Sequence, residues 1–266
     1  MSPLSLRCAD SLLTVSPFGG QALSWQVNGE EQLWLSRDAD LSGHHPIRGG
    51  VPLCFPWFGK AASGPSHGFA RTSLWQVIEQ LSTPTEARLV LALRDSESTL
   101  ALWPHHFEAT ISYTLTPDTL AITLRVTNTD DQPWAFTAAL HSYLQAEVAT
   151  LHLPALSGLP YHDKLENADR LFDDGPDAKL PPIPVDAIVP GLAQLALRQG
   201  DTSLQIHNRG HDATVVWNPG PAHGIGDVHF GGEQEFICLE SALALEPLRL
   251  EPGSSHTLAQ SLSISG

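Results

Sequence analysis

The sequence is poor in cysteine and has no long apolar run. The three cysteines are scattered, with no C-x-x-C pair, at Cys8, Cys54 and Cys238. A sparse, odd set of thiols is typical of a reducing compartment, so we expect free cysteines and a cytoplasmic protein. No apolar run reaches the roughly 18 residues that a membrane helix needs. The first ten residues, MSPLSLRCAD, lack the basic and apolar regions of a secretory signal. We therefore expect no membrane partner.

Positive charge is also scarce. Lys and Arg together number 14, against 29 Asp and Glu, which gives a net charge of -15. Because nucleic-acid binding needs a surface rich in Lys and Arg, we expect no nucleic-acid partner. The same negative charge opposes the approach of an anionic substrate, so any phosphate must be held by local cationic groups. Arg suits that task, because its planar fork pairs with two oxygens.

Metal-ligand spacing is missing although the chain has 13 histidines. There is no HxH, HExxH or Cys/His cluster with the spacing of a metal site. We therefore expect no metal. A cupin-like metal β-barrel, which the number of histidines alone would suggest, is disfavoured for the same reason.

The pattern that is present is that of short β-strands separated by turn residues. Ile111–Leu115 and Leu120–Val126 alternate with period two, and Thr116–Thr119 between them has the composition of a turn, so the pair reads as a hairpin. Many such runs at roughly 8–12-residue spacing predict an all-β sandwich. The expected strands are Leu12–Val15, Leu23–Val27, Gln32–Leu35, Leu74–Leu81, Arg88–Leu93, Ala109–Leu115, Leu120–Asn128, Trp134–Leu140, Ala146–Leu153, Ala193–Leu197, Ser203–His207, Thr214–Trp217, Glu235–Glu240 and Leu258–Ile264.

The domain organisation is expected to be simple. With 42% hydrophobic and 16% charged residues, 266 residues suffice for one large β domain over residues 1–266. The acidic, Pro-rich segment Asn167–Pro190 resembles a linker, but the strand pattern continues on both sides. We interpret it as a long loop within the domain, of the kind that often serves a site.

Two short motifs near the start carry cationic and aromatic residues together: Arg48–Gly59 (RGGVPLCFPWFG) and His67–Arg71 (HGFAR). A stiff, aromatic-lined segment with cationic groups suits a small anionic, partly apolar ligand such as a sugar phosphate. Arg48 and Arg71 could make only structural ion pairs, but their flanking small residues allow close approach of ligand or backbone. Four aromatic residues, Trp57, Phe55, Phe58 and Phe69, are core residues by default, but one or two of them could provide a flat apolar face for a pyranose ring.

Three further residues are candidates for acid–base or binding roles. His141 follows a strand-like run, where a polar side chain usually meets a structural partner. Glu240 lies at the end of the strand-like run Glu235–Glu240. If it is buried without a cationic partner, its pKa is raised and it is suited to act as a general base. If it is exposed, it is an ordinary acid at the end of a strand. Asp186, a lone acid between apolar neighbours, is either a turn former or an acceptor for sugar hydroxyls.

Taken together, these segments resemble the glucose-6-phosphate 1-epimerase-like branch of the aldose 1-epimerase (galactose mutarotase) superfamily. The resemblance runs from about Phe18 through the C-terminal strand, and its first two markers, RGGVPLCFPWFG and HGFAR, are fairly specific together. The later markers are LHSYL at Leu140–Leu144, VDAIV at Val185–Val189, WNP at Trp217–Pro219 and ICLESA at Ile237–Ala242.

The resemblance implies a large antiparallel β-supersandwich and an enzyme that interconverts sugar anomers without a cofactor. By resemblance, His141 is the general acid and Glu240 the general base, with His141 kept charged by a nearby carboxylate. Arg48 and Arg71 would contact the substrate and its phosphate. The remaining matches are a second active-site histidine, His67, and a substrate-binding carboxylate, Asp186.

The sequence departs from the family pattern at two positions. Ser66 stands where relatives often have Gln before the HGFAR histidine, which bears on substrate preference, and Ser241 stands where relatives often have Pro or Asn. The expected partner is a small-molecule sugar phosphate, most simply glucose 6-phosphate, and the expected state is a monomer. The alternatives are a mutarotase of neutral aldoses and a non-catalytic carbohydrate-binding β-sandwich.

Overall fold

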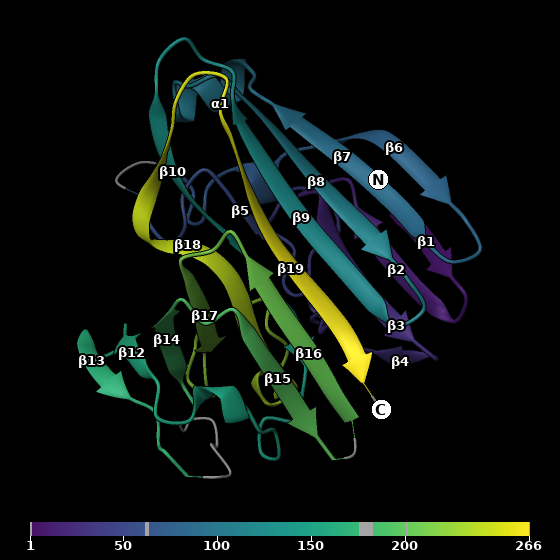
Figure 1. Cartoon of the computed structure of the whole chain (residues 1–266), viewed down its shortest axis with the longest axis vertical. Helices are drawn as coiled ribbons and strands as arrows, with labels where there is room; N and C mark the ends of the chain where they lie inside the picture. The colour runs from purple at the N-terminus through teal and green to yellow at the C-terminus, as the bar shows by residue number, and fades with distance from the viewer. Residues whose placement is uncertain (1, 62–63, 176–182, 201, 266) are drawn as a thin grey trace.

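The computed structural model describes residues 2–61, 64–175, 183–200 and 202–265. Its strands form three sheets, and every ladder within them is antiparallel. The two larger sheets carry most of the chain, and a smaller sheet built from the first strands lies beside them (Figure 1). This architecture confirms the expected all-β supersandwich.

The seven-stranded sheet has the order β15-β16-β19-β9-β8-β7-β6. The last strand of the chain therefore lies between two strands from earlier parts of the sequence, β16 and β9 (Figure 1). Its strands are β6 (Gln76–Ser82), β7 (Ala87–Arg94), β8 (Phe107–Leu115), β9 (Thr119–Asn128), β15 (Gln194–Gln199), β16 (Thr202–Arg209) and β19 (Ser255–Ser265).

The eight-stranded sheet has the order β13-β12-β14-β17-β18-β10-β5, and β11 also pairs with β18. Its strands are β5 (Leu53–Cys54), β10 (Trp134–Leu140), β11 (Tyr143–Gln145), β12 (Pro160–Asp163), β13 (Ala168–Leu171), β14 (Val185–Pro190), β17 (Ala213–Asn218) and β18 (Phe236–Leu250). The first eight residues of β18 are all buried, so this strand runs through the middle of the molecule.

The small sheet and the helices complete the fold. The four-stranded sheet has β1 (Leu4–Cys8), β2 (Ser11–Ser16), β3 (Gln21–Val27) and β4 (Glu30–Glu31) in sequence order. The one α-helix among the described residues, α1 (Glu97–Leu102), is short, as are the 3-10 turns η1 (Ala70–Thr72), η2 (Pro154–Leu156) and η3 (Gly232–Gln234). None of the helices in the described ranges is long and apolar enough to cross a membrane.

The hydrophobic core follows from the period-two pattern of the strands. In β8 every second residue is buried, from Phe107 to Leu115, and the residues between them are half-buried. The predicted hairpin is confirmed, because Leu115 pairs with Leu120 and the Thr116 N–H donates to the Thr119 carbonyl at 2.9 Å across the turn. The main cluster of buried side chains draws on all three sheets.

Two strand predictions and one loop prediction were wrong in detail. Gln32–Leu35 makes only isolated bridges, and Ala146–Leu153 forms no strand. Ala146, Leu151 and Leu153 are buried along a turn, in which the Leu151 N–H donates to the Glu147 carbonyl at 3.0 Å, so burial and not extension explains their spacing. The expected loop Asn167–Pro190 contains β13 and β14 near its two ends, and residues 176–182 of it lie outside the described residues.

Candidate active site

A cleft of about 320 Å³ opens over the middle of the eight-stranded sheet. Its walls come from β14, β17 and β18 and from the loops that carry the two N-terminal motifs. Seven of the eight residues predicted for the site line it: Arg48, Ser66, His67, Arg71, His141, Asp186 and Glu240. These positions span 193 residues of sequence (240 minus 48 plus 1), so only the folded chain brings them together.

Glu240 lies in the buried first half of β18, opposite Val215 of β17. The strand does not end there, as the sequence suggested, but continues to Leu250. Only 1% of Glu240 is exposed, and its Oε2 has no hydrogen-bond partner within the described residues. Burial first, and then the nearby carboxylate of Asp186, raise the pKa of Glu240 well above its usual range.

His141 lies at the break between β10 and β11, both of which pair with β18. The break falls opposite Glu240, and His141 Nδ1 is 3.3 Å from Glu240 Oε1. The two groups are in contact but make no hydrogen bond, and His141 Nδ1 is buried without a hydrogen-bond partner among the described residues. The His141 ring stacks on Tyr143, with centroids 5.0 Å apart and planes 9° apart.

The environment of His141 favours its neutral form. Burial first, and then the neighbouring His67, Arg48 and Arg71, lower the pKa of His141 well below the usual range. The expectation that a neighbouring carboxylate keeps His141 charged is therefore wrong for the ligand-free protein. Burial disfavours charge on both groups. The single proton that the pair holds therefore lies on Glu240, which leaves the carboxyl and the imidazole both neutral.

A buried thiol lies beside this pair. Ligand atoms of His141, Cys238 and Glu240 lie within 4.8 Å of one another, close enough to be tested as a metal site. Burial raises the pKa of Cys238 well above its ordinary value, so the thiol is protonated when no metal is bound.

The two N-terminal motifs pack against each other, and their glycines make this possible. A Cβ on Gly50 would lie 2.1 Å from the Ala22 carbonyl oxygen, and one on Gly68 would lie 2.1 Å from that of Phe55. Both glycines have positive φ, 63° and 74°. These glycines therefore serve backbone approach, not ligand approach, and they bring Arg48 and His67 to the same cleft.

Arg48 is held in place by two partners. Its Nε donates to Asp227 Oδ1 at 3.0 Å and its Nη1 to the Tyr143 hydroxyl at 2.8 Å. Burial opposes the positive charge, but Tyr143 and Asp227 outweigh it and raise the pKa of Arg48 above its usual value. The guanidinium is thus oriented as well as charged.

Within the described part of the chain, Arg71, in η1, is the cleft cation without an acidic partner. Its Nη2 donates to the Ser66 carbonyl at 2.6 Å, and its buried Nε has no hydrogen-bond partner in the described part of the chain. Burial first, and Arg48 next to it, lower the pKa of Arg71. A half-buried guanidinium without an acidic partner among the described residues is a site of positive potential ready for an anion.

His67 offers the cleft a neutral N–H. The Gly59 N–H donates to His67 Nδ1 at 3.2 Å, and Cys54 Sγ lies 3.4 Å from the same nitrogen. With Nδ1 accepting, the ring proton belongs on Nε2. Burial, and then Arg71, Lys164 and Arg48, lower the pKa of His67 to about 3. His67 is therefore a fixed donor and not a proton shuttle near neutral pH.

Asp186 pairs with a lysine that the sequence interpretation missed. Lys164 Nζ is 3.2 Å from Asp186 Oδ2, and the Lys164 N–H donates to the Asp186 carbonyl at 2.9 Å. Asp186 Oδ1 is buried without a partner among the described residues, which leaves an acceptor at the cleft. Burial raises the pKa of Asp186, although Lys164 opposes the shift.

Of the four candidate aromatic rings, Phe58 lines the cleft, and Trp217 lines it as well. Trp57 does not line the cleft; its Nε1 donates to the Pro65 carbonyl at 2.9 Å and its ring packs on Phe69. Phe58 also carries Lys164 over its face, 5.6 Å from the ring centroid. The other lining residues that sequence reasoning did not assign are Val215 and Ile225; Trp217 was visible only as part of the weak WNP marker.

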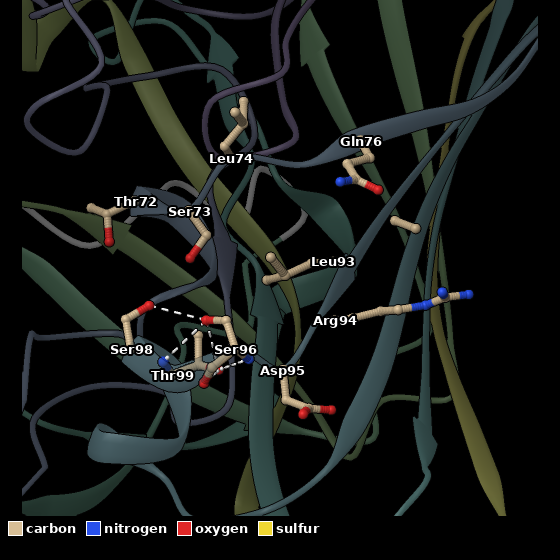
Figure 2. A pocket seen from close by; sticks show the side chains of 11 residues that line it. Thr72, Ser73, Leu74, Gln76, Leu93, Arg94, Asp95, Ser96, Ser98 and Thr99 are labelled. Carbon is tan, nitrogen blue, oxygen red and sulfur yellow. Dashed lines mark hydrogen bonds between the residues drawn. The ribbon is translucent and has the colours of Figure 1, made fainter.

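A larger hollow of about 500 Å³ lies elsewhere, between η1, β6, β7 and α1. Figure 2 shows its hydroxyl groups bonded to one another at the start of α1, where Ser96 and Thr99 form a capping box. Its two charged side chains are already paired, Arg94 with Glu108 and Asp95 with His106. Volume alone would favour this hollow, but it has no free acid–base pair, so the smaller cleft is the candidate site.

The chain is similar to known proteins in both sequence and structure. The model of the family described as aldose 1-epimerase matches residues 4–263. A "putative glucose-6-phosphate 1-epimerase" of Cenchrus ciliaris is 31% identical, covering 92% of this chain and 78% of that protein. A protein of the same description from Escherichia coli is also 31% identical, covering 92% and 84%. The crystal structure of "a putative mutarotase (YeaD)" from Salmonella typhimurium superposes with a TM-score of 0.90 at 28% identity, covering 99% of this chain and 90% of that one.

Proposed function

The chain belongs to the aldose 1-epimerase family, and we propose that it interconverts the α and β anomers of a hexose 6-phosphate, with glucose 6-phosphate as the first candidate. One observation carries this proposal: a buried carboxyl–imidazole pair, 3.3 Å apart, shares a cleft with three cationic side chains. The pair supplies the acid and the base, and the cations supply a place for a phosphate.

The reaction needs one proton on the pair and no cofactor. In ring opening, the Glu240 carboxylate takes the proton of the C1 hydroxyl while the His141 imidazolium donates a proton to the ring oxygen. The C1–O5 bond breaks, and an open-chain aldehyde forms. Rotation about C1–C2 presents the other carbonyl face, and the two groups then close the ring with their proton roles reversed. Each group is expected to contribute about 10²–10⁴-fold to the rate.

The proton count explains why the neutral pair of the ligand-free protein is compatible with this chemistry. Before opening, the proton is on His141; after opening, it is on Glu240. The ligand-free arrangement, with the proton on Glu240, is therefore the protonation state that accompanies the open-chain aldehyde. Forming the closed-ring complex requires the proton to move to His141, so substrate binding has to favour that transfer.

A phosphate in the cleft would favour the transfer. Arg48 and Arg71 lower the pKa of His141 through their positive potential. A dianion paired with these guanidinium groups would offset that potential and raise the pKa of His141. In this proposal the phosphate both anchors the substrate and prepares the acid, so phosphorylated sugars should turn over faster than free sugars as well as bind more tightly.

Anomer exchange measured by NMR tests the proposal. Pure α-glucose 6-phosphate and pure α-glucose are followed to equilibrium with and without the protein. Acceleration of the phosphate ester in preference to the free sugar is the expected result. Acceleration of free glucose alone would identify a mutarotase of neutral aldoses, and acceleration of neither, nor of the galactose and mannose esters, would leave a carbohydrate-binding protein. The predictions of a monomer and of a cytoplasmic location stand apart from this test.

A further inference from the structure

A buried glutamine crosses between the two large sheets directly beneath the acid–base pair. Gln260 of β19 is 1% exposed, and its inward-facing neighbours on the strand, Leu258 and Leu262, are apolar. Its Oε1 accepts from Ser142 Oγ at 2.5 Å. Its Nε2 donates to the Leu239 carbonyl at 3.0 Å and to Asn208 Oδ1 at 3.0 Å, which uses both amide protons.

These bonds reach the neighbours of both catalytic groups. Ser142 follows His141 in the sequence, and Leu239 precedes Glu240. The two neighbours are also bonded to each other, since the Leu239 N–H donates to the Ser142 carbonyl at 3.2 Å. The side-chain amide of Gln260, from the opposite sheet, therefore bonds to both stretches of chain that carry the acid and the base.

A second tie holds the other side of Glu240. Ser241 Oγ donates to the Ala259 carbonyl at 3.2 Å, next to Gln260 on β19. Leu239 and Ser241 thus both bond to β19, while Glu240 between them faces the cleft. The stretch of β18 that carries the base is held at both neighbouring residues.

We propose that Gln260 is a positioning residue that sets the separation of His141 and Glu240; this inference rests on the epimerase function proposed above. The pair makes no direct hydrogen bond, so nothing between the two side chains fixes their 3.3 Å separation. Their backbones must fix it instead, and Gln260 bonds to both stretches in addition to the Leu239–Ser142 backbone bond. Displacement of a reacting group by about 1 Å can cost roughly 10²-fold in rate.

The kinetic test compares Gln260→Met with a matched control, Leu258→Ala. Met keeps the length of the side chain without its hydrogen bonds, whereas Leu258→Ala removes packing from the same face of β19 without touching the network. For Gln260→Met we expect kcat to fall by roughly 10²-fold with KM little changed, because Arg48 and Arg71 are held by other partners. Leu258→Ala should lower the melting temperature and leave kcat as in the wild type.

Ser142→Ala tests the same bond from its other end. Its kcat should fall in the same direction, and the double variant Gln260→Met/Ser142→Ala should fall no further than the more affected single variant. Losses of kcat that multiply in the double variant would show that the two residues act independently and would overturn the proposal. So would a Gln260→Met enzyme that loses stability but keeps the wild-type kcat.

A readout that does not need activity separates this inference from the proposed function. The ¹⁵N signals of the His141 ring report its protonation and tautomer over a pH series in each variant. We expect Gln260→Met to move the His141 titration and to leave that of His67 unchanged. An unmoved His141 titration, or an equal shift in Leu258→Ala, would overturn the positioning role. If the wild type accelerates no anomer exchange, the proposed function fails, and this NMR comparison still decides the role of Gln260.

Discussion

Replacing Arg71 by Met removes a cation from the cleft without leaving an anion behind. Arg71 donates to the Ser66 carbonyl and pairs with no carboxylate among the described residues. Removing Arg71 therefore leaves no carboxylate unpaired, and Met replaces a partly buried charge with an apolar side chain. We expect the free energy of unfolding to change little or to rise.

The effect on activity should depend on the substrate. A hydrogen bond between charged groups contributes about 1.5–3 kcal/mol, which corresponds to roughly 10–100-fold in kcat/KM. Arg71→Met should lose that factor with glucose 6-phosphate and much less with free glucose, which has no phosphate for Arg71 to bind. The assay is anomer exchange by NMR with both sugars at several concentrations.

Arg48→Met is the matched control for the stability argument. In the wild type, Arg48 donates hydrogen bonds to Asp227 and to the Tyr143 hydroxyl. Arg48→Met leaves both groups without this donor, so it should destabilise the fold by about 1–3 kcal/mol. Equal losses of kcat/KM for glucose 6-phosphate and free glucose in Arg71→Met would refute the phosphate role. A destabilisation of Arg71→Met as large as that of Arg48→Met would refute the description of Arg71 as an unneutralised cation.

Three further predictions concern the acid–base chemistry. Glu240→Gln and His141→Gln should each lose at least roughly 10²-fold in kcat while circular dichroism shows an unchanged fold, and either variant at the wild-type rate would remove the assignment. Because the pair works with one proton, kcat should fall both in acid, where a second proton binds, and in alkali, where the proton is lost; a flat profile contradicts this. For His67, the folded pKa of about 3 lies below the unfolded value, so the unfolded chain binds the extra proton and stability falls as the pH drops below about 6.5. His67 contributes about 1.5 kcal/mol to this loss between pH 6.5 and 5, and the buried His141 adds to it. Urea titrations should therefore show a smaller loss in His67→Asn than in the wild type, and equal losses would contradict this; Asn tolerates the left-handed backbone (φ 65°) of this position.

Much of the fold could be predicted from local patterns. The β8–β9 hairpin follows from period-two alternation on either side of a turn, which are local properties of the chain. Ala146–Leu153 misled because a buried loop has apolar side chains at similar intervals. β14 lay within a segment judged by its acidic and proline content, and its pairing with β17 is a long-range contact that composition does not reveal.

Part of the candidate site could likewise be predicted from the sequence, and part could not. Most of the motif residues lie in one cleft, but Trp57 packs beside it. A sequence motif does not indicate on which side of the backbone a side chain lies, so the position of this ring could not be predicted. Lys164 escaped notice because its relevance depends on the pairing of β12 with β14, which brings it to Asp186. The protonation of His141 could not be predicted from the sequence either, because it depends on burial and on neighbours, Arg48 and Arg71 among them, that folding brings together.

The central claim is that Glu240 and His141 open and close the ring of a phosphorylated hexose. The most direct test is the rate at which pure α-glucose 6-phosphate reaches anomeric equilibrium, followed by NMR with the wild type and with Glu240→Gln at equal concentration. The account predicts clear acceleration by the wild type, and a rate with Glu240→Gln close to that of buffer alone. Equal acceleration by both proteins would contradict it, because the exchange would then proceed without the carboxylate to which the mechanism assigns the C1 proton.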